Sequence, residues 1–208
     1  MRAALLKRSW LAIALALALL LGLGCGDDDD DGNNEETDPV ALTLQGWAEF
    51  EALNWDGART LFEAAIRTGS KSTESYSGAG WTYFMLGGNN ATARTRWLEG
   101  LNGKTGGVND IHFGLGSLDM LEEDYVSAIE HFETVLDRSP TYTFIHQPGI
   151  NKDDLYLALA DCYYKEADFE NSLANVKMIN SSFDADVSTV EGVTALGQEI
   201  DRLTTRIG

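Results

Sequence analysis

The sequence contains few of the residues from which catalytic and metal sites are built. Its 208 residues include two cysteines, three histidines and three prolines, and 15 basic side chains stand against 33 acidic ones. It has no paired-cysteine or H-E-x-x-H spacing, no nucleophile elbow and no phosphate-binding glycine loop. The formal net charge of −18 repels nucleic-acid phosphates. We therefore expect a non-enzymatic protein without metal or cofactor, whose acidic surface favours a basic protein partner over nucleic acid.

Long apolar runs are also rare, and the one that is present lies near the start of the chain. Three basic residues precede an unbroken apolar run over 11–21, and small residues then lead to Cys25. The 16 residues of 10–25 are fewer than the roughly 20 that a membrane-spanning helix needs. A secretory signal over residues 1–24 is therefore favoured over a retained membrane anchor.

The end of this segment, Leu-Gly-Cys, resembles a bacterial lipoprotein processing site, in which the cysteine is acylated. The resemblance implies lipidation at Cys25, and hence an exported protein held on a membrane of the bacterial envelope. Cys162 would then have no disulfide partner. Its apolar neighbours Leu159 and Ala160 predict that it is a small buried hydrophobe rather than a reactive thiol.

An acidic segment follows the cysteine. Residues 25–38 hold eight acidic side chains and no basic one, and like charges at this density extend a chain into a solvated tether. The alternative is a calcium loop, because acids and a glycine match EF-hand positions at Asp27, Asp29, Asp31, Gly32 and Asp38. A simple acidic run matches such a pattern by chance, and no helix is predicted to enter it. The tether is therefore the favoured interpretation.

Small residues recur in pairs twelve positions apart along the rest of the chain. The pairs are Gly46 and Ala58, Gly80 and Thr92, Gly116 and Ala128, and Ala160 and Ser172. The internal offset holds while the intervals between pairs grow through 34, 36 and 44 residues. A constant unit with variable connections is typical of stacked helical hairpins. We predict four of them, over 39–72, 73–107, 108–140 and 153–183.

These hairpins resemble the tetratricopeptide repeat family, whose unit is 34 residues long. The family's small residue, alanine and following aromatic residue are matched by Gly46, Ala58 and Phe62, and again by Gly116, Ala128 and Phe132, with Pro140 at the terminal proline. Glu49 and Asp119 stand where the family has tyrosine. Over about 145 residues, the resemblance implies an all-α, right-handed superhelix of about four antiparallel hairpins.

A C-terminal helix is predicted within residues 184–208. Apolar residues follow at helical spacing at Val190, Val193, Leu196, Ile200, Leu203 and Ile207. Ser188 and Glu191 have the spacing of a capping box. A helix at this place would cover the open side of the last hairpin. A dimer contact or a docked partner is the alternative use of its apolar face.

The resemblance also implies a ligand groove along the first helix of each hairpin, one and four positions after the small residue. Those positions hold Trp47, Phe50, Trp81, Phe84, Ser117, Met120, Asp161 and Tyr164, and Phe113 lies one turn before Gly116. We take Trp47, Phe50, Trp81, Phe84, Phe113, Met120 and Tyr164 as the candidate binding residues. Their aromatic and thioether side chains are typical anchors for peptides. The alternative is that they are ordinary core.

The connection over 141–153 is longer than the others and contains Tyr142, Phe144 and His146. Its aromatic content predicts that it packs back onto the hairpins. The favoured function is a lipid-anchored scaffold that binds a protein or peptide partner. The alternatives are a glycan or small-molecule binding lipoprotein and a structural subunit of an envelope assembly complex.

Overall fold

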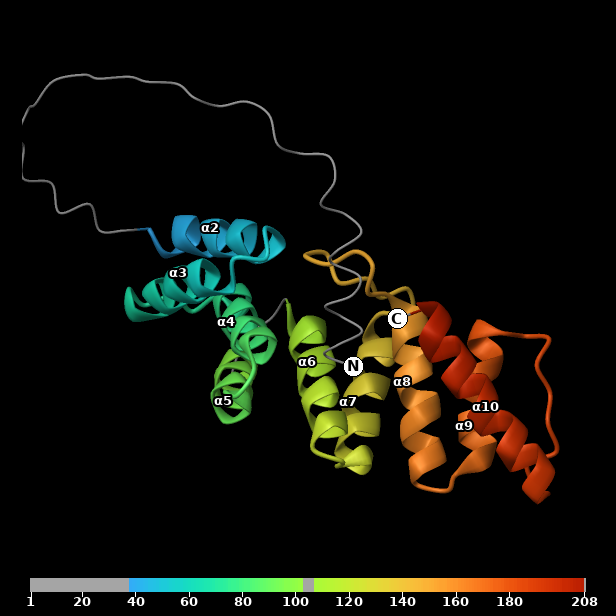
Figure 1. Cartoon of the computed structure of the whole chain (residues 1–208). Helices are drawn as coiled ribbons and strands as arrows, with labels where there is room; N and C mark the ends of the chain where they lie inside the picture. Colours follow the sequence, from blue (N-terminus) through green and yellow to red (C-terminus); the bar gives the residue numbers. More distant parts are fainter. Residues whose placement is uncertain (1–37, 103–106, 208) are drawn as a thin grey trace, which may run out of the picture.

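The computed structural model describes residues 38–102 and 107–207, and within them it is all-α. The predicted signal over 1–24, and the lipidation site Cys25 with the tether up to residue 37, lie outside the described residues. Consecutive helices pack as antiparallel pairs that follow one another along the molecule (Figure 1). The pairs are α2 (Pro39–Glu51) with α3 (Trp55–Arg67), α4 (Thr73–Leu86) with α5 (Asn90–Leu101), α6 (Val108–Leu121) with α7 (Tyr125–Arg138), and α8 (Lys152–Lys165) with α9 (Phe169–Ile179).

The turns inside three of the pairs share one backbone geometry. Leu53, Glu123 and Ala167 all have φ near +60°, which L-residues seldom adopt. The next residue is Asn or Asp in each case, and its side chain caps the following helix at Asn54, Asp124 and Asp168. The α4–α5 turn instead uses Gly87 and Gly88, at φ +75° and +73°. The repeat is therefore present in the backbone as well as in the sequence.

The small residues of the repeat lie where the helices of a pair cross. A Cβ added at Gly46 would meet the ring of Phe62 at 2.8 Å, and one at Gly116 would meet Phe132 at the same distance. A Cβ at Gly80 would overlap the indole of Trp97. Close approach of the backbones leaves room only for hydrogen at these positions. The prediction of stacked hairpins built on these residues is confirmed.

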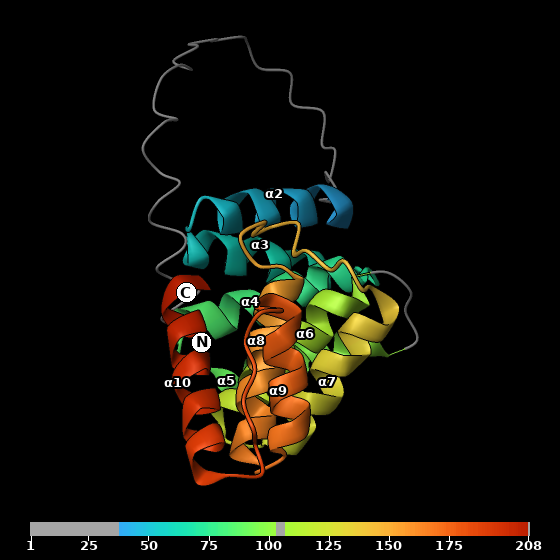
Figure 2. The same cartoon turned by 90° about the vertical axis from the view of Figure 1, so that its right-hand side faces the viewer.

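The last helix, α10 (Val190–Ile207), packs against α8 and α9 at the end of the array (Figure 2). Its buried residues Leu196, Ile200 and Leu203 form a small second core with Val176 and Ala160. The predicted amphipathic helix is therefore present and covers the last pair. The expected capping box is wrong, because the Gly192 N–H donates to the Thr189 hydroxyl at 3.0 Å. The Ser188 hydroxyl instead donates to Asp186.

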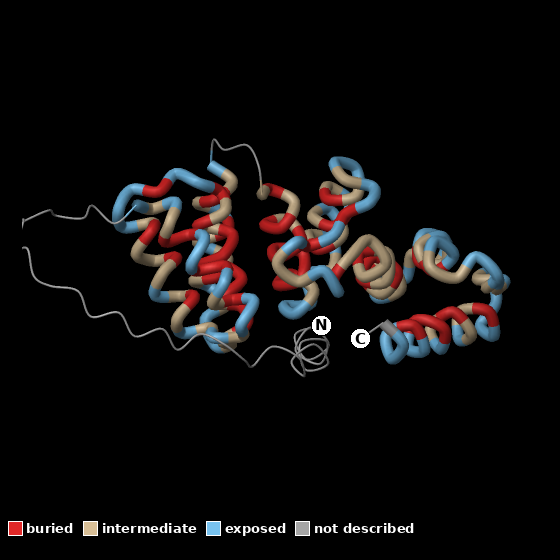
Figure 3. Tube along the Cα trace, turned by 90° about the horizontal axis from the view of Figure 1, so that it is seen from above, coloured by how far each residue is buried: buried red, intermediate tan, exposed pale blue. Residues whose placement is uncertain are grey.

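Buried residues run as a continuous band through the packed pairs, and the exposed residues lie on the outer surface (Figure 3). The main core extends from Trp47 in α2 to Cys162 in α8. Within the described residues, no helix is long and apolar enough to cross a membrane. Asp38, the last position of the calcium-loop alternative, accepts a hydrogen bond from the Val40 N–H and caps α2.

Candidate functional site

Five of the predicted groove residues form one aromatic cluster on the first helices of three pairs. The members of this aromatic cluster are Trp47 and Phe50 on α2, Trp81 and Phe84 on α4, and Phe113 on α6. None is more than 4% exposed. As an open groove surface the prediction is therefore wrong. The expected proximity of these side chains is present, but another part of the chain covers them.

The covering segment is the connection between α7 and α8, residues 139–151, which we call the connector. In Figure 1 it runs from the ends of α7 and α8 toward α2. Phe144 is fully buried, and its ring stacks on Trp81 with centroids 5.0 Å apart and planes at 29°. The same ring contacts Trp47 at 6.1 Å and Phe50 at 6.4 Å. The prediction that this connection packs back onto the hairpins is confirmed.

The connector carries its own hydrogen bonds. The Phe144 N–H donates to the Ile150 carbonyl at 3.0 Å, and the Gln147 N–H donates to the Phe144 carbonyl at 3.1 Å. The Lys152 N–H donates to the Tyr142 carbonyl at 2.9 Å, beside a bridge between Thr143 and Asn151. Because its backbone groups are paired internally, the connector depends on the helices mainly through its side chains.

His146 joins the connector to the first hairpin. Its ring lies flat on the indole of Trp47, with centroids 3.6 Å apart and planes at 2°. Its Nδ1 is 2.8 Å from a Glu51 carboxylate oxygen, and its Nε2 is 3.9 Å from Glu74. Burial alone would lower the pKa of His146, but hydrogen bonding to Glu74 and Glu51 raises it above the ordinary 6.5. The pair of carboxylates thus favours a positive charge at this place.

Tyr142 joins the other end of the connector to α6. Its hydroxyl donates to Asp110 at 2.7 Å, and the Trp81 indole N–H donates to the Asp110 carbonyl at 3.1 Å. Burial raises the pKa of Asp110 to about 6, although the hydrogen bond from Tyr142 opposes that rise. Burial and the neighbouring Asp110 hold the pKa of Tyr142 well above 10.

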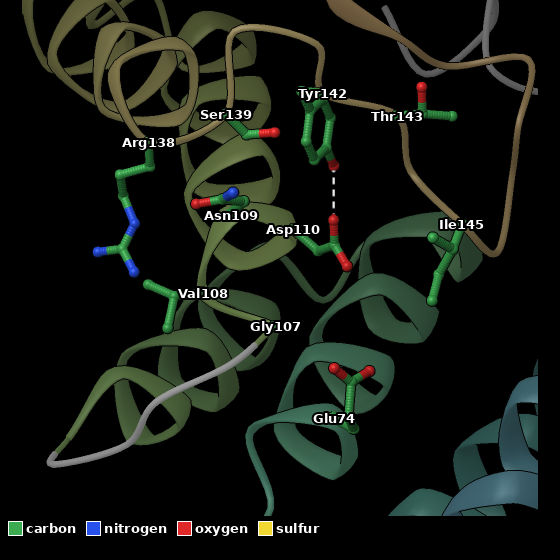
Figure 4. A pocket seen from close by; sticks show the side chains of 10 residues that line it. All are labelled: Glu74, Gly107, Val108, Asn109, Asp110, Arg138, Ser139, Tyr142, Thr143 and Ile145. Carbon is green, nitrogen blue, oxygen red and sulfur yellow. Dashed lines mark hydrogen bonds between the residues drawn. The ribbon is translucent and has the colours of Figure 1, made fainter.

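A pocket of about 310 Å³ opens beside this bond, with Glu74 on one side and Arg138 on the other (Figure 4). The two side chains come from different pairs, α4 and α7, and the connector supplies Tyr142, Thr143 and Ile145. Figure 4 shows the Asp110 carboxylate in the middle of the lining, directed at the Tyr142 hydroxyl. The pocket therefore lies where the connector meets the helices.

The sequence and the fold of this chain were compared with those of known proteins. No protein-family model and no curated protein matches the sequence. A crystal structure of a tetratricopeptide repeat protein from Parabacteroides merdae is similar with a TM-score of 0.53, at 14% identity, over 83% of this chain and 64% of that one. This chain has the tetratricopeptide-repeat fold. It spans a little under two thirds of the protein it resembles. PilF of Pseudomonas aeruginosa is similar over 79% of this chain and 91% of its own, at 13% identity and with a TM-score of 0.40.

Within the tetratricopeptide-repeat fold, the other two predicted groove residues lie apart from the aromatic cluster's centre. Met120 is half-buried at the C-terminal end of α6 and packs against the main core. Tyr164 belongs to the second core, where its ring contacts Phe169 and its hydroxyl donates to the Val193 carbonyl at 3.4 Å. Tyr164 therefore holds α10 in place and does not join the other residues in a single groove.

The other titratable groups of note are a pair of histidines on α6 and α7 and a buried thiol on α8. His112 and His131 face each other with their Nδ1 atoms 3.0 Å apart, and His131 lies 3.6 Å from the buried Asp119. Burial raises the pKa of the Cys162 thiol to about 12, in keeping with the predicted inert role. The described residues contain no group of three or more side chains that could hold a metal ion.

The sequence analysis did not identify three acidic residues of the site, because no sequence pattern marks them clearly. Glu51 lies one helical turn after Trp47, and this spacing is the only hint that it faces the same place. Glu74 and Asp110 stand in the first turns of their helices, where acids are common for reasons of helix capping and dipole. Only the packed structure brings them to the connector.

Proposed function

We propose that this protein is a lipid-anchored interaction scaffold of a bacterial cell envelope, and that the face formed by α2, α4 and α6 binds a peptide segment of a protein partner. The tetratricopeptide-repeat fold is typical of non-enzymatic protein scaffolds. The observation that carries the proposal is the connector itself. A turn-forming aromatic segment of the chain already occupies this face, with Phe144 fully enclosed by rings of two hairpins.

The same observation disfavours the glycan-binding alternative. The faces of Trp81 and Trp47, on which a sugar ring would stack, are occupied by side chains of a peptide segment, and this favours a protein occupant over a glycan. Phe144 stacks on the first and His146 on the second. The amphipathic face of α10, which a permanent assembly contact would use, is packed on α8 and α9.

Site-specific photocrosslinking in intact cells of the source bacterium tests the binding face. A photoreactive amino acid replaces Ile145, which is 67% exposed at the connector, or Met178, which is 57% exposed on α9. We expect a protein adduct at position 145, which α7 and α8 keep tethered beside the face even when the connector is displaced from it, and no adduct at position 178. Equal labelling at both positions, or none at either, would contradict a partner at this face.

Lipid anchoring is tested separately. Cys25→Ser removes the acylated thiol, and we expect the protein to move from the membrane fraction to the soluble fraction, because acyl chains supply the membrane affinity. Incorporation of an alkyne-labelled fatty acid should be lost at the same time. Cys162→Ser is the control and should leave both readouts unchanged.

A further inference from the structure

We infer that the face formed by α2, α4 and α6 recognises a turn-forming segment with an aromatic side chain and, two positions later, a cationic side chain. Phe144 and His146 of the connector are then an internal copy of that ligand, which the partner displaces. This inference rests on the proposed function, because it names the kind of partner that the same face takes.

The aromatic position is defined by the surroundings of Phe144. Its ring is enclosed by Trp81, Trp47 and Phe50, with centroid distances of 5.0, 6.1 and 6.4 Å. The enclosing rings come from α2 and α4, so two hairpins build the site together. Offset and edge-on ring contacts select a flat aromatic side chain over an aliphatic one.

The cationic position is defined by the surroundings of His146. The indole of Trp47 forms its floor at 3.6 Å, and the carboxylates of Glu51 and Glu74 flank it at 2.8 and 3.9 Å. An aromatic face with two carboxylates is a site for a cation. His146 brings less than a full positive charge near neutral pH, because histidine titrates in that range. A lysine or arginine stays charged there and would satisfy both carboxylates better.

A buried hydrogen-bond donor at this face, the indole N–H of Trp47, also lacks an acceptor within the described residues. The Trp81 and Trp97 indole N–H groups donate to the carbonyls of Asp110 and Ser77. The buried Trp47 Nε1 has no acceptor within the described residues. Buried donors are almost always paired in folded proteins. A backbone carbonyl of a bound segment would give this donor an acceptor that the connector does not supply.

The connector is built so that it can leave as a unit. Its backbone is closed on itself by the bonds of Phe144 to Ile150 and of Gln147 to Phe144, so removal from the face breaks few main-chain bonds to the helices. The connector joins two helix pairs and is part of neither, because it lies between α7 and α8 in the sequence. As a tethered ligand it competes with an effective concentration on the order of millimolar. Deleting its two anchoring side chains should therefore raise the affinity for an external segment.

The test uses the full chain carrying Cys25→Ser, with or without the double change Phe144→Ala and His146→Ala. The probe is a fluorescein-labelled synthetic peptide with the sequence of residues 141–150, followed by fluorescence anisotropy. We expect the double variant to bind it at least tenfold more tightly than the parent chain. A peptide with arginine in place of its histidine should bind a further threefold or more tightly, and this gain should shrink in high salt.

Two controls make the result specific. A peptide with alanine in place of its phenylalanine should lose at least tenfold in affinity, and Ile145→Ala, at an exposed position of the connector, should not raise peptide affinity. Circular dichroism reports whether each variant is folded. If the double variant does not fold, the peptides are compared on His146→Ala, where the arginine peptide must still bind at least tenfold more tightly than the alanine peptide.

A folded variant that binds all the peptides alike, or none, overturns the inference. The proposed function fails in a different way. If a partner is crosslinked at position 145 but the variant binds all peptides alike, the proposed scaffold function is supported and the preference for an aromatic and a cationic side chain is wrong. If the variant binds the peptides selectively but no protein is crosslinked in cells, the preference for these side chains is supported and the proposed function as a scaffold for a protein partner is contradicted.

Discussion

The imidazole of His146 lies parallel to the indole of Trp47, 3.6 Å between centroids and 2° between planes. One ring belongs to the connector before the fourth hairpin and the other to the first helix of the first hairpin. With Glu51 and Glu74 beside it, this contact fastens the long connection to the first helices of two pairs, α2 and α4. It makes the stability of the fold depend on the protonation of one side chain.

We expect part of the stability to disappear as the pH rises above neutrality. The folded pKa of His146 is raised above its unfolded value of 6.5, so its contribution is complete below 6.5 and is lost as pH rises through the folded pKa. The loss should be on the order of 1 kcal/mol, because the two carboxylates are partly exposed. Urea unfolding at pH 6 and pH 8.5 should show a larger loss in the parent chain than in His146→Gln, which keeps only the smaller fall that Asp110 contributes.

Asp110 acts in the same direction over a lower range of pH. Its folded pKa is about 6 against an unfolded value of 3.8, so the folded state binds the extra proton between those values. The free energy of unfolding should fall by about 1 kcal/mol between pH 5 and pH 7.5, given 1.36 kcal/mol per unit of pKa difference. Asp110→Asn keeps an acceptor for Tyr142 and should remove the share of the fall that Asp110 contributes, leaving the share that His146 contributes above pH 6.5. An unchanged pH profile in that variant would count against the assignment.

Truncation of two adjacent connector residues, Phe144 and Ile145, should change the stability by very different amounts. Phe144→Ala removes a fully buried ring and should lower the free energy of unfolding by about 3–5 kcal/mol. Ile145→Ala, at a side chain that is 67% exposed, should change it by less than about 0.5 kcal/mol. Denaturant unfolding followed by tryptophan fluorescence measures both, because the lost ring stacks on Trp81. Equal losses of stability in the two variants would contradict the burial of Phe144 and the exposure of Ile145.

A single methyl group should disturb the crossing of α4 and α5. Gly80→Ala places a Cβ against the indole of Trp97, which is fully buried and cannot move aside easily. Overpacking of this kind costs about 1–3 kcal/mol, more than the roughly 1 kcal/mol that alanine returns through helix propensity. Thermal unfolding should therefore show a lower midpoint. Leu98→Ala on α5, a residue that is 49% exposed, is the matched control and should have little effect.

The hairpins could be predicted from sequence because their determinants are local and repeated. Gly46, Gly80 and Gly116 precede the rings that they contact, those of Phe62, Trp97 and Phe132, by 16 or 17 positions, and helix geometry turns that spacing into a contact. The capping residue of α10 shows the limit of such patterns. Ser188 and Thr189 are both good caps, and only the path of the chain through Asp186 decides between them.

The sequence by itself determined that helices would form, that they would pair, and that rings from α2, α4 and α6 would gather on one face. The tertiary structure alone decided whether that face is open. The connector reaches α2 from far along the chain, and no periodicity encodes a contact such as that of His146 with Glu51, separated by 95 positions. Burial of Phe144 against Trp47 and Trp81 depends on which loop is long enough and apolar enough to cross the helices, which is a property of the assembled molecule.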